Sequence, residues 1–131
     1  MTEGRNISTM KRPLSPRLSV YRWRMTMLAS LAHRASGLML VLFVPVYLWL
    51  LHGMTGTPED FSNTLSWMHA PPGRVVLWLT GASLIYHIVN GIRFLCLDAG
   101  WGESSEAMRF TARVVIGVGV AAAVLLGVIL W

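Results

Sequence analysis

The segment VVLWLTGASLIYHIVNGI, residues 75–92, contains 18 consecutive residues without a formal charge. A helix needs roughly 20 predominantly apolar residues to cross a bilayer, so this segment predicts a membrane span. Two further segments have the same character: residues 114–131, and residues 35–51, which extend back to position 25 if His33 and Arg34 are accepted within a helix. The fold class expected is therefore all-α, a three-transmembrane-helix membrane-anchor bundle with spans at about 25–52, 74–97 and 110–131.

The composition agrees with lipid as the main solvent of this chain. Only 13% of the 131 residues are charged and 54% are hydrophobic, whereas soluble domains average about 25% charged residues. Pro13 and Pro16, in RPLSP, oppose a regular helix before the first span. We expect residues 1–22 to form a cytoplasmic N-terminal tail and residues 23–131 to form the transmembrane domain, with the lipid bilayer as a partner.

The distribution of charge predicts the orientation in the membrane. Loop 52–73 contains Glu59 and Asp60 but no Lys or Arg, whereas segment 93–113 contains three Arg. Lys and Arg concentrate on the cytoplasmic side of a membrane, so we expect a cytoplasmic N-terminus and a periplasmic C-terminus in a bacterial inner membrane. No basic face on a soluble module is visible, so no nucleic-acid partner is expected. Six basic residues precede the first span: Arg5, Lys11, Arg12, Arg17, Arg22 and Arg24.

The connecting segments contain recognisable start and stop signals. Thr57 is a candidate cap for a short interfacial helix that begins with Pro58, Glu59 and Asp60. Gly100 and Gly102 indicate a turn before the third span. In that span, small residues at every fourth position predict a face that packs closely against a neighbouring helix: Gly119, Ala123 and Gly127.

The first span carries polar residues that share one helical face. Ser30, His33, Arg34 and Gly37 follow the spacing i, i+3, i+4, i+7. An ionisable side chain within a membrane is costly and usually functional. The alternative for Arg34 is that it reaches back to the cytoplasmic phosphates, with Ser30 bonded to its own backbone. That alternative does not account for His33.

The second span carries a matching polar stripe of Thr80, Ser83, His87 and Gly91. A lone histidine is often only a packing residue. However, the helical rise places His87 about 15 Å, and His33 about 9 Å, from the cytoplasmic ends of antiparallel helices, so both imidazoles and Arg34 can converge. Gly91 would leave room beside the His87 ring. This arrangement predicts a haem, with its propionates toward the cytoplasm.

The ligand shell of such a haem can be only partly assigned from this chain. Ser83, one turn before His87, is a candidate hydrogen-bond partner for the second ring nitrogen. His52 and His69 belong to the periplasmic side, and His33 is better placed for a propionate. If two histidines bind the iron, the other imidazole would come from a partner chain.

Three motifs are similar to those of a known family: RPLSP (12–16), SLAHRASG (30–37) and HIVNGIRFLCLDAG (87–100). Together they resemble the cytochrome b556 membrane-anchor subunit of succinate dehydrogenase (Complex II), over nearly the whole chain. One departure is Phe94, because many relatives have histidine after the GIR sequence.

The resemblance implies a role in a larger complex rather than catalysis by this chain alone. The partners implied are a second small membrane-anchor subunit, an iron–sulfur subunit and a flavoprotein subunit, and ubiquinone is the substrate. His87 would be the axial ligand of haem b, with the other axial ligand from a partner subunit. Ser30 and Arg34 would contact quinone, and His33 and Arg34 would lie near the haem propionates.

Two other functions fit the same residues. The chain could be the anchor of a fumarate reductase or of a menaquinone-linked complex, which the sequence does not separate from the first reading. It could instead be a haem-free membrane scaffold subunit, in which His87 and Arg34 only join helices. A transporter fits less well, because it would need a relay or substrate site that reaches both surfaces, and the periplasmic half has no buried ionisable residue.

Overall fold

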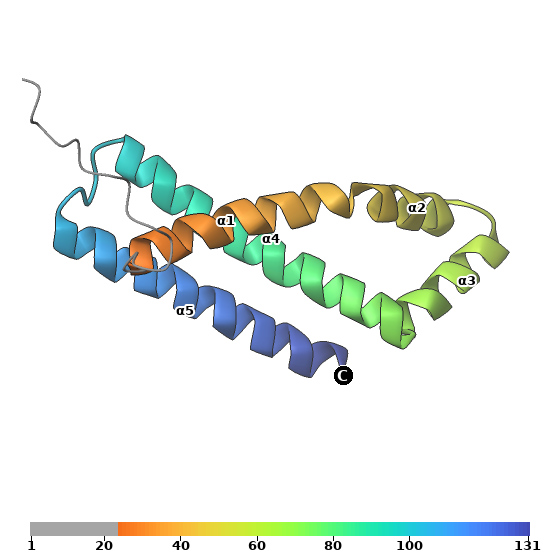
Figure 1. Ribbon diagram of the computed structural model, residues 1–131. Helices are drawn as coiled ribbons and strands as arrows, with labels where there is room; N and C mark the ends of the chain where they lie inside the picture. The colour runs from red at the N-terminus through yellow and green to blue at the C-terminus, as the bar shows by residue number, and fades with distance from the viewer. Residues whose placement is uncertain (1–23) are drawn as a thin grey trace, which may run out of the picture.

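A computed structural model describes residues 24–131 of the chain (Figure 1). The predictions made for the N-terminal tail, including RPLSP, lie outside the described residues. The described part is helical, with no β-strand. Its five helices are α1 (Met25–Leu42), α2 (Val44–Thr55), α3 (Pro58–His69), α4 (Pro71–Asp98) and α5 (Ser105–Leu130).

Three of these helices, α1, α4 and α5, are long and apolar enough to cross a membrane. They contact one another in all three pairings, and α4 lies alongside α5 over much of its length (Figure 1). The predicted all-α, three-span architecture is therefore confirmed. The starts of α1 and α5 lie at one end of the bundle, and α2 and α3 extend from the other end.

The first apolar segment is broken rather than a single helix over 25–52. The break falls at Phe43, between α1 and α2, and the second helix carries a proline, Pro45, in its first turn. Proline lacks the N–H that would bond to the preceding turn, so it interrupts the helical ladder. The N–H of Phe43 still donates to the Met39 carbonyl at 3.1 Å, and that of Tyr47 donates to Phe43 at 3.0 Å. The helices α1 and α2 thus follow one another with only Phe43 between them.

Helix α3 has the start that the sequence predicts. Thr57 is its N-cap and Pro58 occupies the first turn. The Thr57 hydroxyl oxygen accepts from the Asp60 N–H at 3.2 Å, and the Asp60 carboxylate accepts from the Thr57 N–H at 3.0 Å and from its hydroxyl at 2.7 Å. This reciprocal arrangement is a capping box, which satisfies backbone donors that have no partner within the helix.

The turn between α4 and α5 also agrees with the sequence. Gly100 and Gly102 have φ angles of +82° and +77°, a conformation that side-chain-bearing residues rarely adopt. Ser104 then caps α5, because its hydroxyl oxygen accepts from the Ala107 N–H at 3.2 Å. The helix therefore begins at Ser105, five residues before the predicted start of the span, since a cap and a polar first turn precede its apolar part.

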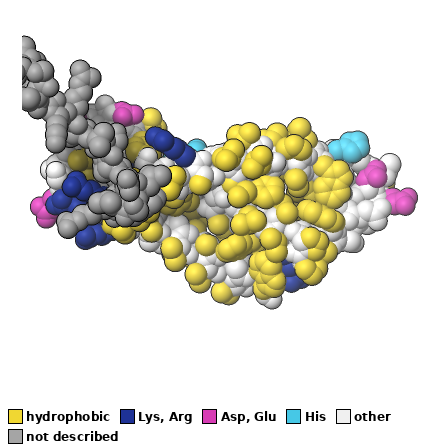
Figure 2. Space-filling model, viewed as in Figure 1, with side chains coloured by type: hydrophobic (Ala, Val, Ile, Leu, Met, Phe, Trp, Pro, Cys, Tyr) yellow, Lys and Arg dark blue, Asp and Glu magenta, His cyan; other side chains and the backbone are white. Residues whose placement is uncertain are grey.

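Large apolar side chains cover the outside of the bundle, as expected for a surface that faces lipid. Hydrophobic residues spread over the middle of the molecule, whereas charged groups lie toward its two ends (Figure 2). Ile129, for example, is 77% exposed, while the fully buried apolar residues Ala29 and Ala112 are small.

The small-residue face of α5 packs against aromatic residues of α4, as predicted. A Cβ on Gly119 would lie 2.6 Å from Cδ2 of Tyr86, so only glycine allows this approach. Farther along the contact between α4 and α5, toward the C-terminus of α5, the indole N–H of Trp78 donates to the Ala123 carbonyl at 2.7 Å. Close approach of small residues and interhelical hydrogen bonds are the contacts that hold helices together in lipid.

The capping box makes the start of α3 sensitive to pH. Hydrogen bonds from the hydroxyl and the backbone N–H of Thr57 lower the pKa of Asp60 below its ordinary value. The contribution of the Asp60 carboxylate to the stability of the cap is therefore present at neutral pH and is lost as the pH falls through the lowered pKa, below about pH 4.

We expect Thr57→Ala to accelerate amide hydrogen exchange at Asp60 several-fold at pH 7. The ratio of variant to wild-type rates should shrink at pH 3. Ser62→Ala, on the same exposed helix, should leave exchange at Asp60 unchanged, and an equal acceleration in both variants would contradict the assignment.

Candidate functional site

Two histidines from different spans form the centre of the candidate site. The rings of His33 on α1 and His87 on α4 stack with their centroids 4.0 Å apart and an interplanar angle of 10°. Both side chains are half-buried. The prediction that the two imidazoles converge agrees with this geometry. The depths of the two rings in the membrane stay a prediction.

Each imidazole lies against a glycine of the opposite helix. A Cβ on Gly37 of α1 would lie 2.9 Å from Cε1 of His87, and a Cβ on Gly91 of α4 would lie 3.6 Å from Nε2 of His33. The prediction that Gly91 leaves room beside the His87 ring is wrong. Gly91 faces His33, and Gly37 faces His87. The difference arises because each ring extends across the contact between α1 and α4 and lies against the opposite helix.

Hydrogen bonds determine the tautomer of His87. Its Nδ1 lies 3.1 Å from the Ser36 hydroxyl oxygen and 3.2 Å from the His33 carbonyl oxygen. The Ser36 hydroxyl itself donates to that carbonyl at 2.8 Å, so both neighbours of Nδ1 act as acceptors. We therefore assign the proton to Nδ1. A neutral His87 then has its lone pair at Nε2, which is the state of a metal-binding imidazole.

The partner of the His87 ring differs from the one expected. Ser83 was the candidate because it lies one turn earlier on the same helix. In the structure, Ser36 of α1 takes that position, and Ser83 lines an apolar groove between α1, α4 and α5. A partner on a neighbouring helix depends on how the helices cross, which spacing along one helix does not report.

His33 has an unsatisfied polar atom. Its Nε2 is buried and has no hydrogen-bond partner among the described residues. The edge of Phe94 packs against the ring, with the centroids 5.2 Å apart, so the residue that departs from the GIRH pattern encloses His33. A buried nitrogen without a partner is uncommon in folded proteins and requires an explanation. A bound group that accepts or donates a hydrogen bond would provide one.

Ser30 and Arg34 lie on the α1 face that also carries His33, as their spacing predicts. Ser30 is half-buried and Arg34 is exposed. Within residues 24–131, neither side chain forms a hydrogen bond. The structure thus brings His33 and His87 into contact and leaves Ser30 and Arg34 with free polar groups near the surface of the bundle.

A buried polar network beside the histidines has no counterpart in the sequence-based assignment. The Ala29 carbonyl accepts from the Tyr86 hydroxyl at 2.9 Å and from the Asn90 side-chain amide at 2.8 Å. Asn90 is completely buried. These bonds join α4 to α1 one turn before His33, so they help to set the register at which the two imidazoles meet.

Arg93 extends the same network to α5. Its Nε donates to the Thr111 hydroxyl at 3.0 Å, and its Nη2 donates to the Met108 carbonyl at 3.2 Å. Its Nη1 lies 3.5 Å from the Asn90 side-chain oxygen. The acceptors are mainly main-chain carbonyls and hydroxyls of other helices. The sequence showed the donors Asn90 and Arg93 at a spacing of three, which marks one face, but gave no sign of these acceptors.

Fold and site together define a multi-pass membrane protein whose spans bring two histidines together. Within residues 24–131, no group of three or more His, Cys, Asp or Glu could hold a metal ion directly. Any metal at this site would therefore have ligands beyond the side chains of the described residues.

Comparison with known proteins identifies the family. The family model described as "Succinate dehydrogenase/Fumarate reductase transmembrane subunit" matches residues 8–126, and the chain belongs to this family. Proteins named "Succinate dehydrogenase cytochrome b556 subunit" are similar over nearly their whole length. The one from Coxiella burnetii is 32% identical over 122 residues, 92% of this chain and 98% of the relative. The one from Rickettsia felis is 30% identical over 131 residues, 100% and 99% of the two chains, and the one from Paracoccus denitrificans is 31% identical over 124 residues, 92% of each.

The buried network predicts a stability difference between two polar substitutions in α4. Asn90→Ala removes the bond to α1 and a neighbour of Arg93, so we expect it to lower the free energy of unfolding by roughly 1–2 kcal/mol. Thr80→Val is the matched control, because the Thr80 hydroxyl is buried without a partner among the described residues. Thr80→Val should leave the free energy of unfolding unchanged or raise it slightly. Thermal or denaturant unfolding of the detergent-solubilised protein measures both, and equal losses would show that the network does not join the helices.

Proposed function

We propose that this chain is the cytochrome b membrane-anchor subunit of a succinate dehydrogenase, in which it helps to bind haem b and ubiquinone. The observation that carries the proposal is the state of His87. Its Nδ1–H is held by acceptors of α1, so its Nε2 lone pair is free for a metal, within a membrane span. The names of the relatives support this function, since they are called cytochrome b556 subunits of succinate dehydrogenase.

The residues present fit a haem. When bound, the haem supplies an iron centre that carries one electron at a time. His87 would be one axial ligand, oriented by Ser36 and the His33 carbonyl. The second axial ligand would come from a partner subunit. His33 would bond a propionate through its otherwise unpartnered Nε2, and the Arg34 guanidinium would neutralise propionate charge from the same face of α1.

Ser30 and Arg34 would form this chain's part of a ubiquinone site. The Ser30 hydroxyl can donate a hydrogen bond to a quinone carbonyl oxygen. Arg34 can stabilise the negative charge that develops on that oxygen during reduction, which is more effective at low dielectric than in water. Both side chains are free of hydrogen bonds to other described residues, so a ligand would not have to displace internal partners.

The proposed setting is a complex in a bacterial inner membrane, with the N-terminus in the cytoplasm and the C-terminus in the periplasm. The chain would act with a second small membrane-anchor subunit, an iron–sulfur subunit and a flavoprotein subunit, and would not be an enzyme alone. The charge distribution supports this orientation, because Arg24, Arg109 and Arg113 lie at the bundle end where α1 and α5 begin. The division into a tail (1–22) and a transmembrane domain (23–131) stays a prediction.

A fumarate reductase or menaquinone-linked anchor is the second candidate, because the description of the matching family includes fumarate reductase. The two differ in the direction of the reaction and the quinone used. Assays of the purified complex with ubiquinone and menaquinone analogues, in both directions, separate them.

The haem assignment is tested by His87→Ala in the assembled complex. We expect the haem bound per complex, measured by pyridine haemochrome absorbance, to fall at least about ten-fold, because loss of an axial ligand removes the bond that holds the iron. His52→Ala, in α2, should retain the haem. Normal haem content in His87→Ala would contradict the assignment and favour a haem-free scaffold.

A second pair of variants tests whether the His87 ring must be held in its observed position. Gly37→Ala places a methyl group against that ring and should shift the absorbance or electron paramagnetic resonance spectrum of the haem. Gly117→Ala is the control, because a Cβ there meets no atom within 4 Å. An unchanged spectrum in Gly37→Ala would show that the packing of Gly37 on His87 does not orient the ligand.

The quinone assignment is tested by Ser30→Ala and Arg34→Leu. We expect both variants to leave succinate oxidation by a soluble dye unchanged. Both should reduce kcat/KM for ubiquinone, and Arg34→Leu should reduce it by roughly 10²-fold or more. Arg113→Leu, an exposed arginine on α5, is the control for general loss of charge. Normal ubiquinone kinetics in Arg34→Leu would exclude a role for Arg34 in the quinone site.

A further inference from the structure

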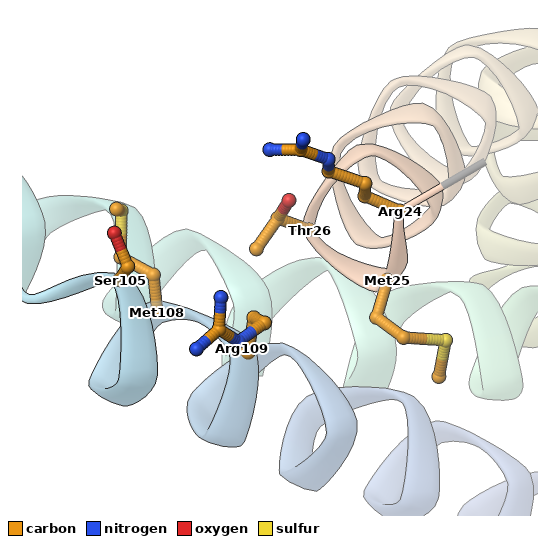
Figure 3. Close-up of a pocket in the computed structure, with 6 residues that line it drawn as sticks. All are labelled: Arg24, Met25, Thr26, Ser105, Met108 and Arg109. Carbon is orange, nitrogen blue, oxygen red and sulfur yellow. The ribbon is translucent and has the colours of Figure 1, made fainter. Parts of the chain in front are cut away.

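Two cavities meet at the end of the bundle where α1 and α5 begin. The first has a volume of about 490 Å³. It opens between the first turns of the two helices, with polar side chains of both helices around it (Figure 3). Its lining residues are Arg24, Met25, Thr26, Ser105, Met108 and Arg109.

This first cavity is cationic. Arg24 and Arg109 come from different elements, and neither forms an ion pair with another residue in the described part of the chain. Glu106 is close in sequence but does not line the cavity. Two guanidinium groups beside the hydroxyls of Thr26 and Ser105 match a phosphate, which arginine binds through paired N–H donors.

The second cavity is an apolar groove of about 710 Å³ between α1, α4 and α5. Leu28, Ala32 and Ala35 contribute its α1 wall, and Val120 lies on its α5 side. Met25 lines both cavities. The two cavities are therefore neighbours at Met25, and a cationic cavity next to an apolar groove matches the polarity of a lipid with an anionic headgroup.

Part of the groove wall on α1 points away from the proposed haem and quinone residues, although Ser36, which contacts the His87 ring, also lines the groove. Residues two positions apart on a helix are about 200° apart around its axis. Ala32 and Ala35, which line the groove, are therefore nearly opposite Ser30 and Gly37 on α1. A subunit that supplies an axial ligand would pack on the histidine side, leaving this face of α1 for another occupant.

The sequence that precedes the first cavity is itself basic. Segment 1–23 contains five Lys or Arg and one acidic residue, Glu3. Its charge has the same sign as that of Arg24 and Arg109, so it does not complement the cavity. It would add to the attraction for anionic lipid at the same membrane surface.

We propose that these two cavities form a binding site for one anionic phospholipid. The phosphate lies between Arg24 and Arg109 and accepts hydrogen bonds from Thr26 and Ser105, and an acyl chain lies in the groove between α1 and α5. The lipid lies in the groove beside the contact between α1 and α5, and it anchors the start of both helices at the membrane surface.

The test measures lipid retained by the purified complex. The complex is reconstituted in nanodiscs of dioleoyl-phosphatidylcholine with 10% dioleoyl-phosphatidylglycerol, re-extracted in detergent, and analysed for bound lipid by mass spectrometry. We expect wild type to retain phosphatidylglycerol in preference to phosphatidylcholine. The double variant Arg24→Gln/Arg109→Gln should weaken the retention of phosphatidylglycerol about 30-fold, because each arginine contributes a factor of about five and the two factors multiply.

Separate variants test the groove. Ala32→Trp should fill it and release phosphatidylglycerol without changing the charge, and Ala35→Leu is a milder substitution for use if the first variant does not assemble. The controls are Arg113→Gln, which removes an exposed arginine outside both cavities, and Val124→Trp, which adds a ring to an exposed position of α5. Both should retain the lipid. Haem absorbance, measured on every variant, reports the proposed haem site separately.

Three results would overturn the proposal. The double variant could retain phosphatidylglycerol as wild type does, or wild type could retain phosphatidylcholine equally well. Alternatively, the double variant could keep the lipid but lose the iron–sulfur subunit during purification, which would identify the cationic cavity as a protein-docking surface.

Discussion

The carbonyl oxygen of Ala29 is the point on which the arrangement of the spans depends. It accepts hydrogen bonds from Tyr86 and Asn90 of α4 at a position where Ala29 and Asn90 are both completely buried. In a bilayer, these donors have no water to bond with, so a lost bond leaves an unsatisfied polar group. The contact fixes the register of α1 against α4 one turn before His33, which is why His33 and His87 meet.

The hydrogen bonds of the neighbouring polar side chains depend on this register. Arg93 continues from Asn90 to α5 and joins the third span through Thr111 and Met108. On the other side of Ala29, the His33 carbonyl oxygen and the Ser36 hydroxyl oxygen accept hydrogen bonds from the Nδ1–H of His87. One set of contacts thus positions three helices and also sets the tautomer of His87, the proposed haem ligand. Stability and the proposed function therefore depend on the same small group of residues.

Much of the fold could be predicted from the sequence, because it depends on signals within single segments. Uninterrupted apolar length gave the spans, Thr57 and Asp60 gave the cap of α3, and two glycines gave the turn after α4. The break at Phe43 was missed, although Pro45 is visible, because membrane helices often tolerate proline and the outcome depends on the neighbours of the helix.

The site could be predicted only in part. Periodicity placed Ser30, His33 and Arg34 on one face and placed His87 in the polar stripe of the second span. The pairing of Gly37 with His87, the contact of Ser36 and the acceptors of Asn90 depend on how two helices cross. Backbone carbonyls are present at every position, so no sequence pattern distinguishes the one at Ala29 from the others.

The measurement that tests this account most directly is a reduced-minus-oxidised absorbance spectrum of the complex containing this chain, solubilised in detergent. The complex is reduced first with succinate and then with dithionite, after all subunits have been shown to be present. The account predicts a b-type haem band with succinate, or with dithionite if the haem has a low potential. Absence of a band with both reductants would contradict the haem assignment, and His33 and His87 would then be a structural contact between two membrane helices.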